Sequence, residues 1–391
     1  MCRPRVGSRR RRNLQVHGHR RPLPLETMIE SLYLHVPFCE DICAYCDFTR
    51  VKIHPILVEK YLLTLFDEIK AIPKHPMKTL YLGGGTPSAL ATEELEALFS
   101  SLEGYHDPST EFTMEANPDS ITGEKAELMV RYGVNRVSMG VQTFDADELA
   151  LLNRTHTAQD IENAISTLHQ AGIHNLSIDL IYGLPRQTLE SWEATLRHAV
   201  SLDISHISLY SLTIEEHSEF GRKGMKQCDG DLEAAMYFKA VQVLGEQGFD
   251  RYEISSFTKD KPSRHNLAYW HYDEFYGLGP GATQMTDHRR IVKTTNLDRY
   301  AKGKTVGEIT ELSVDDEQFE FIMMGLRLTE GIDLDRFESR FHLRAEERFA
   351  QAILENVAKK RLVLTTNRLA CTDEGLAMLN DVLLSFLPDT P

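Results

Sequence analysis

The sequence is poor in cysteine and tryptophan, with six and two in 391 residues, and it contains no long apolar run. Without about 18 consecutive apolar residues, neither a transmembrane helix nor the apolar core of a secretory signal peptide is available, so we expect a soluble protein. Six cysteines are too few for a disulfide scaffold. This scarcity favours a reducing compartment, which we take to be the cytoplasm.

Basic residues are scarce outside the N-terminus. The first 27 residues contain eight arginines and one acid, Glu26, which leaves 35 basic against 57 acidic residues in the rest of the chain. An acidic body of this kind disfavours nucleic acid as the main partner. We interpret residues 1–27 as a disordered basic extension. It fits an organellar transit peptide only loosely, and a translation start at Met28 fits it better.

From residue 31 onward, short apolar segments alternate with amphipathic helical patterns. Six strands are predicted, each followed by a helix, at residues 31–36, 78–82, 111–116, 136–140, 176–181 and 206–212. Six such units in one chain predict an α/β fold with a parallel sheet that closes partly, as in a TIM-like barrel. We therefore expect a partial (β/α)6 barrel over residues 28–255.

The alternation stops beyond residue 255. Residues 264–282 are rich in aromatic residues and glycine without clear periodicity, and we interpret them as a packed functional loop within a connecting region, 256–312. Residues 313–391 predict helices, a hairpin at 361–372 and a final helix, which is an α+β arrangement like a winged helix. With 9 basic against 15 acidic residues, this domain is expected to pack or bind a partner, because its charge repels DNA phosphates.

Unusual polar residues stand where the predicted strands end. Cysteines follow the first strand and GGGTP (83–87) follows the second, while Glu115, Gln142 and Asp179 lie at or near the ends of the next three. Parallel barrels place their functional groups at this face of the sheet, so these residues predict one site. The three glycines would let backbone N–H groups approach a ligand.

Three of the cysteines lie within eight positions. Cys39, Cys43 and Cys46 form a C-x3-C-x2-C pattern directly after a strand. Three thiolates in one loop suit a 4Fe-4S cluster whose fourth iron stays open. A zinc site is the alternative, but structural zinc takes four protein ligands and no second Cys pair or Cys/His pair stands at finger spacing. The nearest spare imidazole, His35, lies inside the first strand.

With Tyr45 before the last cysteine, this pattern resembles the signature of radical-SAM proteins, in which S-adenosylmethionine (SAM) chelates the open iron and is cleaved to a radical. The resemblance extends from residue 31 to about 387 through YLHVPFC, YCDF, GGGTPS, EANP, RVSMGVQTF, LNRTH, DLIYGLP, HISLYSL, HNLAYW and GLGPGA. These motifs are similar to the family that contains oxygen-independent coproporphyrinogen III dehydrogenase and the heme chaperone HemW.

The resemblance implies which residues bind SAM. Three of them would contact the molecule on the cluster, and others would line the neighbouring space, where the dehydrogenase holds a second SAM. The contacts are Tyr33, Gly84 and Glu115; Tyr45 belongs to the cluster motif, and the neighbouring positions are Gly85, Thr86, Gln142, Arg154 and Asp179.

Two sequence features distinguish the dehydrogenase from the chaperone within this family. The dehydrogenase has a further cysteine two residues after the third one, where this chain has Phe48. The chaperone type instead carries an HN-x3-W motif, present here as His265, Asn266 and Trp270. Histidine is a good axial ligand for heme iron, and aromatic residues stack on porphyrins, although a hydrogen-bonded loop histidine is the simpler interpretation of His265 alone.

We therefore expect a heme chaperone with a 4Fe-4S cluster, SAM and heme as its cofactors. The resemblance implies transfer of heme to an acceptor protein, for example a membrane-associated respiratory one, and an electron donor. The alternative is coproporphyrinogen III dehydrogenase, a radical enzyme that decarboxylates propionate side chains. Whether the chain forms a homodimer bridged by a cluster or by heme stays an open question, because neither kind of bridge leaves a pattern in the sequence.

Overall fold

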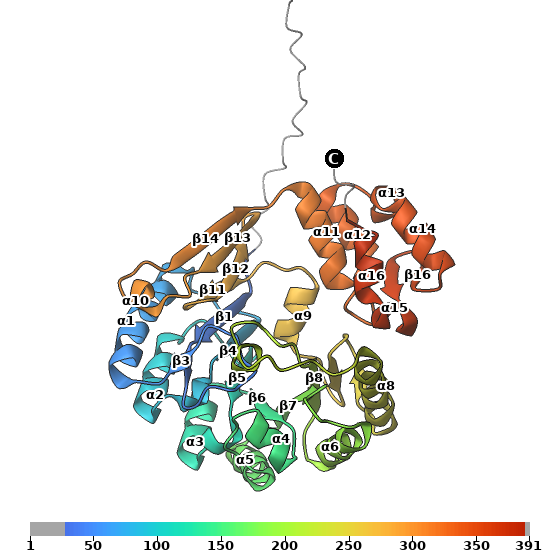
Figure 1. Ribbon diagram of the computed structural model, residues 1–391. Coiled ribbons are helices and arrows are strands. Elements are labelled where there is room, and N and C mark those ends of the chain that lie inside the picture. Colours follow the sequence, from blue (N-terminus) through green and yellow to red (C-terminus); the bar gives the residue numbers. More distant parts are fainter. Residues whose placement is uncertain (1–27, 388–391) are drawn as a thin grey trace, which may run out of the picture.

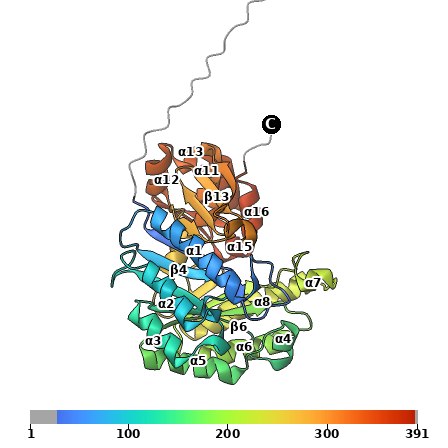
Figure 2. The ribbon, with the colours of Figure 1, turned by 90° about the vertical axis from the view of Figure 1, so that its left-hand side faces the viewer.

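The computed structural model describes residues 28–387, so the expectation for residues 1–27 lies outside the described residues, as do residues 388–391 of the last domain. The chain forms an open barrel of parallel strands, a small sheet at one edge, and a helical C-terminal unit beside the opening (Figures 1 and 2). Helix α9 (Arg264–Trp270) lies between the barrel and the C-terminal unit.

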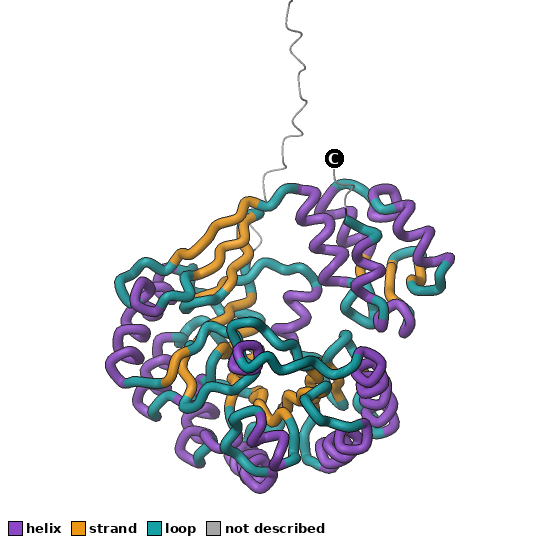
Figure 3. The backbone as a smooth tube through the Cα atoms, viewed as in Figure 1, coloured by secondary structure: helices purple, strands orange, loops and turns teal. Residues whose placement is uncertain are grey.

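The six predicted strands form the centre of a nine-stranded sheet, in chain order and all parallel, which confirms the expected partial barrel. Helices cover its outer face (Figure 3). The strands are β1 (Ser31–Val36), β4 (Thr79–Gly84), β5 (Glu111–Ala116), β6 (Arg136–Gln142), β7 (Asn175–Tyr182) and β8 (His206–Ser211). These helices are α1 (Pro55–Ala71), α2 (Thr92–Ser101), α3 (Gly123–Arg131), α4 (Ala146–Leu151), α5 (Ala158–Ala171), α6 (Leu189–Ser201) and α8 (Gly230–Glu246). The short helix α7 (Glu219–Arg222) lies at the opening instead, where the N–H of Phe220 donates to the carbonyl of Ala44.

The two faces of these strands differ in chemistry. Leu32 and Leu34 of β1 are fully buried in the main hydrophobic core. The residue between them, Tyr33, lies in register with Tyr81 of β4 and lines a cavity instead. Since side chains alternate along a strand, one face of the sheet packs on apolar side chains while the other presents polar ones at the opening.

Three further strands extend the sheet, and none was predicted. β11 (Tyr276–Leu278) pairs parallel to β1, while β10 (Ser256–Thr258) and β9 (Asp250–Arg251) continue the other edge in antiparallel fashion. Two or three residues are too few to show periodicity. The prediction of a loop over residues 264–282 was also wrong, because this segment contains helix α9 and β11; the seven residues of α9 make only about two turns, too few for a clear helical pattern.

A second sheet of three antiparallel strands adjoins this edge. It contains β12 (Thr283–Thr286), β13 (Arg289–Lys293) and β14 (Val306–Glu311), and α10 (Leu297–Tyr300) stands between the last two. The turn between β12 and β13 places Asp287 and His288 at φ angles of 50° and 60°. Both angles fall in the left-handed region that tight hairpin turns require.

The C-terminal unit has its own core around Phe321, Phe337 and Phe349. It consists of α11 (Val314–Gly325), α12 (Leu334–Phe341), α13 (Ala345–Arg348), α14 (Ala350–Ala358), α15 (Asp373–Ala377) and α16 (Leu379–Leu384), with β15 (Ile332–Asp333), β16 (Leu362–Leu364) and β17 (Arg368–Cys371) in one small sheet. Strands β16 and β17 form the expected hairpin. We keep 28–255, 256–312 and 313–391 as a proposed division into domains. Within residues 28–387, no helix has the length and apolar character to cross a membrane.

Candidate cofactor and ligand site

The cysteine loop leaves the barrel directly after β1. Cys39 ends β2 (Phe38–Cys39), which pairs with β3 (Val51–Lys52), so that both ends of the loop are held together. The backbone N–H of Ala44 donates to the carbonyl of Leu152 at 3.0 Å, and the Asn153 side chain donates to the carbonyl of Ile42 at 2.7 Å. The loop is therefore anchored to the segment after α4.

Two of the three cysteine sulfurs have a side-chain hydrogen-bond donor close by. Thr86 Oγ1 lies 3.7 Å from the sulfur of Cys39, and Arg154 Nη1 lies 3.4 Å from that of Cys43. Burial raises the pKa of Cys39 to about 11 against the lowering effect of Thr86, and burial also raises the pKa of Cys46.

This donor set suits a cluster. In residues 28–387, no three His, Cys, Asp or Glu side chains are grouped tightly enough for one metal ion. A 4Fe-4S cluster needs no such convergence, since each thiolate binds a different iron. Donors at two of the sulfurs, a threonine hydroxyl and a guanidinium, would also favour the thiolate form that a cluster requires.

The glycine turn after β4 packs against the start of the cysteine loop. Gly84 has a φ of 113°, and a Cβ there would lie 2.5 Å from the His35 ring. A Cβ on Gly85 would lie 2.6 Å from the carbonyl of Phe38. The backbone N–H of Gly84 donates to Glu115 at 2.9 Å and that of Gly85 to the carbonyl of Val36 at 2.8 Å. In this conformation these two N–H groups bond within the protein, and the expectation that they approach a ligand stays a prediction.

Glu115 lies at the centre of the barrel mouth. Besides Gly84, its carboxylate accepts a hydrogen bond from the Tyr81 hydroxyl at 2.8 Å. Burial raises its pKa despite these two donors. Each carboxylate oxygen keeps a free lone pair, so Glu115 can still accept from a ligand's ammonium or hydroxyl group.

Arg154 links three parts of the site. Besides its contact with Cys43, its guanidinium donates to Asn117 Oδ1 at 2.9 Å and to the carbonyl of Gly140. Gln142 lies beside it at a φ of 68°, where the pairing of β6 with β7 shifts register. A Cβ on Gly140 would come within 3.2 Å of Arg154 and 2.9 Å of Gln142. The bulge in β6 thus brings Gln142 and Arg154 together next to the cysteine loop.

Asp179 lies deeper in the barrel, where the Ser138 hydroxyl donates to it at 3.3 Å. Burial, followed by repulsion from Glu115, raises the pKa of Asp179 to about 7. The guanidinium of Arg136, which is 2% exposed, opposes this shift. Arg136 was not singled out from the sequence, although a cation at the first position of an apolar strand was a visible signal.

A cavity of about 700 Å³ lies at the mouth of the barrel. Its lining comes from three parts of the chain: residues of β1, β4 and β5 in the barrel, the segment after Cys46, and the wall formed by α9, the β12–β13 hairpin and α11. The lining includes Tyr33, His35, Phe48, Gly84, Glu115, Tyr269, Trp270, Tyr272, Phe275, Met285, Arg290, Glu320, Met323 and Met324. Aromatic and thioether side chains dominate the side away from the cysteine loop.

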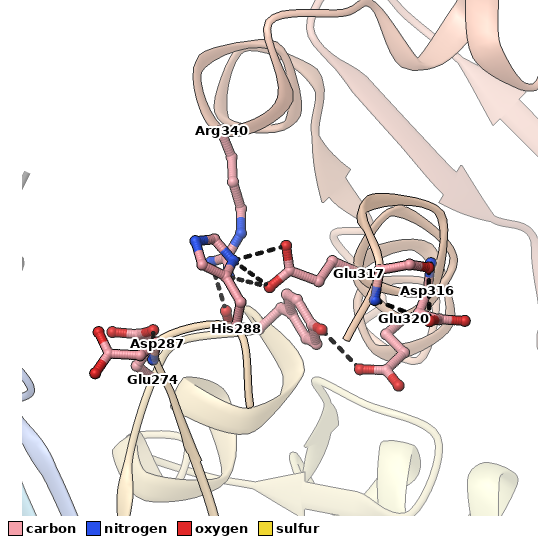
Figure 4. Close-up of polar contacts among 9 residues, drawn as sticks. Glu274, Asp287, His288, Asp316, Glu317, Glu320 and Arg340 are labelled. Carbon is pink, nitrogen blue, oxygen red and sulfur yellow. Dashed lines mark hydrogen bonds and ion pairs between the residues drawn. The ribbon is translucent and has the colours of Figure 1, made fainter. Parts of the chain in front are cut away.

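Polar contacts join this wall to the C-terminal unit (Figure 4). Glu320 of α11 accepts from the Tyr272 hydroxyl at 2.6 Å. It also pairs with Arg290 of β13 at 2.6 Å. Glu317, one turn earlier, pairs with His288 of the hairpin turn at 2.9 Å. Arg340 of α12 donates to the carbonyl of Tyr272 at 3.1 Å.

The residues of the HN-x3-W motif do not share one environment, although all three lie on α9. His265 is 1% exposed, and its two ring nitrogens are hydrogen-bonded to Thr79 and to the Tyr269 hydroxyl, each at 2.8 Å. Ser263 caps α9, and its hydroxyl oxygen accepts a hydrogen bond from the backbone N–H of Asn266 at 3.4 Å. Trp270 alone lines the cavity, with the Arg327 guanidinium 4.5 Å from its ring. In this conformation His265 is a structural residue, and its role as a heme ligand stays a prediction that requires its ring to move.

The structure thus brings together Tyr33, Gly84 and Glu115 at the cavity, and Gln142 and Arg154 near the cysteine loop. Sequence reasoning missed Tyr81, whose signal was a second tyrosine in register with Tyr33. It also missed the part of the wall formed by the β12–β13 hairpin and α11, because nothing local in the sequence shows which segments pack there.

Comparisons with known proteins agree with this architecture. The profile of the radical SAM superfamily matches residues 33–199, and that of the HemN C-terminal domain matches residues 312–378. The heme chaperone HemW of Lactococcus lactis is 34% identical, with 92% of this chain and 97% of that protein covered. The chain belongs to the HemW family of radical SAM proteins.

Two further comparisons place this HemW-family chain. The mouse radical S-adenosyl methionine domain-containing protein 1, mitochondrial, is 33% identical over 92% of this chain and 87% of its own length. The solved structure of coproporphyrinogen III oxidase (HemN) from Escherichia coli aligns with a TM-score of 0.80 at 22% identity, covering 91% and 89% of the two chains, and shows the shared fold. Membership of the superfamily implies SAM and a 4Fe-4S cluster as cofactors, as the cysteine spacing predicts.

Proposed function

We propose that this chain is a heme chaperone that binds heme in the cavity at the barrel mouth and passes it to an acceptor protein. The observation that carries the proposal is the cavity itself, about 700 Å³ between a cysteine loop and an aromatic wall. Its size lies within the range of sites that enclose a medium-sized organic ligand. The names of the bacterial relatives, heme chaperone HemW, support the same ligand.

The chemistry of the lining supports a porphyrin. Trp270, Phe275 and Tyr272 supply flat apolar surfaces on which a macrocycle can stack. Arg290 offers a guanidinium for a carboxylate, and a heme propionate would compete for it with Glu320. We propose Trp270 and Arg290 as heme contacts. Asn266 lies on the same helix as Trp270 and stays a predicted heme residue on the strength of the motif alone.

We propose that Cys39, Cys43 and Cys46 would hold the cluster, and that Tyr33, Gly84 and Glu115 would contact SAM. The cluster, when bound, supplies the electron for reductive cleavage of SAM. Tyr45, Gly85, Thr86, Gln142, Arg154 and Asp179 would hold these groups in position. For Thr86 and Arg154, the hydrogen bonds to cysteine sulfurs support this role.

The deciding experiment is an anaerobic assay of the reconstituted protein. We expect heme to bind with a defined absorbance change, and coproporphyrinogen III with SAM and dithionite to yield no decarboxylated product. Product formation at a useful rate would overturn the chaperone assignment in favour of the dehydrogenase. Phe48, which is 65% exposed at the edge of the cavity, stands where that enzyme has a cysteine and supports the chaperone.

The partners and the location are proposals as well. We propose a membrane-associated heme protein as acceptor, a separate electron donor, and the cytoplasm as the compartment, where thiols stay reduced. Cell fractionation would distinguish the cytoplasm from a mitochondrial location, which is the one printed in the name of the mouse relative. A homodimer bridged by heme would appear as a heme-dependent doubling of mass in sedimentation.

A further inference from the structure

We propose that the thioether of Met323 supplies an axial ligand to the iron of heme held in the cavity. This inference rests on the proposed heme binding and names the atom that holds the cargo. Methionine sulfur is an established ligand of heme iron, alone or opposite a histidine.

The imidazoles and phenols around the cavity are already engaged. His35 lines it, but its Nε2 is hydrogen-bonded to the carbonyl of Thr49 at 2.7 Å and its Nδ1 to the Tyr33 hydroxyl at 3.0 Å. The Tyr272 hydroxyl donates to Glu320, and the Tyr269 hydroxyl is bonded to His265. Any of these groups would have to lose a buried hydrogen bond before it could bind iron.

Three methionines line the same cavity without any such engagement among the described contacts. Met285, on β12, is 7% exposed and belongs to the core of the C-terminal unit, and Met324 packs against that core. Met323 is half-buried and does not belong to that core. Its side chain can therefore turn toward a ligand at the smallest cost in packing.

The position of Met323 on α11 also fits. It lies three residues after Glu320, so the two side chains share one face of the helix, and both line the cavity. Glu320 pairs with Arg290, the residue proposed to meet a propionate. One helix face thus places a soft iron donor next to the group that orients the porphyrin edge. An unbranched, polarisable methionine suits a site that must also release its ligand.

The experiment is a heme titration of the anaerobically reconstituted full chain, read by absorbance and by near-infrared magnetic circular dichroism of ferric heme. The wild type should show the charge-transfer band of a thioether–iron bond. Met323→Leu, which nearly conserves volume, should lose that band and bind heme at least about tenfold more weakly, since even groups behind a metal ligand are worth about 10- to 100-fold in affinity. Met324→Leu and Met285→Leu are the matched controls and should keep the band.

Met323→His gives a second, positive readout. A new imidazole at this position should restore tight binding with a histidine-type spectrum. The proposal is overturned if the thioether band is missing from the wild type, survives in Met323→Leu, or disappears only in one of the control variants. If the wild type binds no heme at all, the proposed function itself fails, and this result is distinct from the loss of one spectral band.

Discussion

The two walls of the cavity differ in how the chain builds them. The cysteine loop is local: the fourteen residues between β1 and β3 carry all three thiols. The opposite wall collects Trp270, Arg290 and Met323 from three elements spread over more than fifty residues, and its position depends on how the C-terminal unit packs. A binding site whose residues come from one short segment should survive a change in the packing of a distant domain. A site whose residues come from several packed elements should not.

The largest expected effect is loss of the cluster at one wall while heme binding at the other wall is kept. Cys43→Ala should abolish the 4Fe-4S absorbance, since a cluster held by three thiolates does not survive the loss of one. Heme affinity should remain within about twofold of the wild type, a difference of roughly 0.4 kcal/mol, because none of the three cysteines lines the cavity. Iron and sulfide content measure the first outcome, and heme titration the second.

Cys228→Ala is the control and should change neither property. If Cys43→Ala lost heme binding together with the cluster, the two walls would depend on each other and the predicted independence would be wrong.

The reverse experiment targets the packed wall. Phe337 is fully buried in the core of the C-terminal unit, and Phe337→Ala should destabilise that unit by about 3–5 kcal/mol. Heme binding should weaken strongly while cluster content stays unchanged. Urea unfolding followed by limited proteolysis measures the stability. Leu354→Ala, at a site 69% exposed in the same unit, should stay within about 0.5 kcal/mol.

A smaller effect is expected at one cavity side chain. Trp270→Leu removes an aromatic surface from the lining and should weaken heme binding by about 1 kcal/mol, or roughly fivefold, without altering the cluster. Heme titration measures this change. Phe238→Leu, at an exposed position outside the cavity lining, serves as the control. An unchanged affinity in Trp270→Leu would place the stacking surface elsewhere.

The last expected effect is on stability rather than on ligand binding, and it depends on pH. Burial raises the pKa of Asp179 to about 7, so its ionised form is disfavoured in the folded protein. This group therefore lowers stability progressively as pH rises from about 4 to 7, and Asp179→Asn should gain stability relative to the wild type over that window, by about 1 kcal/mol per pH unit or less. Urea unfolding at pH 5 and pH 8 measures the difference.

Asp160→Asn provides the contrast, because hydrogen bonds from Thr157 lower the pKa of Asp160 and place its titration below this window. Its effect on stability should be the same at pH 5 and pH 8. A flat response in Asp179→Asn would mean that Asp179 stays ionised in the barrel.

The same contrast explains how much could be predicted from the sequence. Strands of six or more residues with helices between them showed their periodicity, and the thiols and the polar strand ends pointed to one barrel mouth. The short β9, β10 and β11 gave no such signal. His265 was interpreted from its motif alone, but α9 turns it toward Thr79 and Tyr269. Such orientation depends on tertiary packing, and no pattern within one segment records it.

The pairing of β1 with β11 has a consequence for biosynthesis. The strand that leads into the cysteine loop is completed on one side by residues 276–278, which a ribosome adds only after about seven tenths of the chain. Gly279 then passes so close to His35 that a Cβ would lie 2.4 Å from its carbonyl oxygen. A nascent chain therefore exposes the three thiols long before their setting is finished, and cluster insertion belongs to a late stage of maturation.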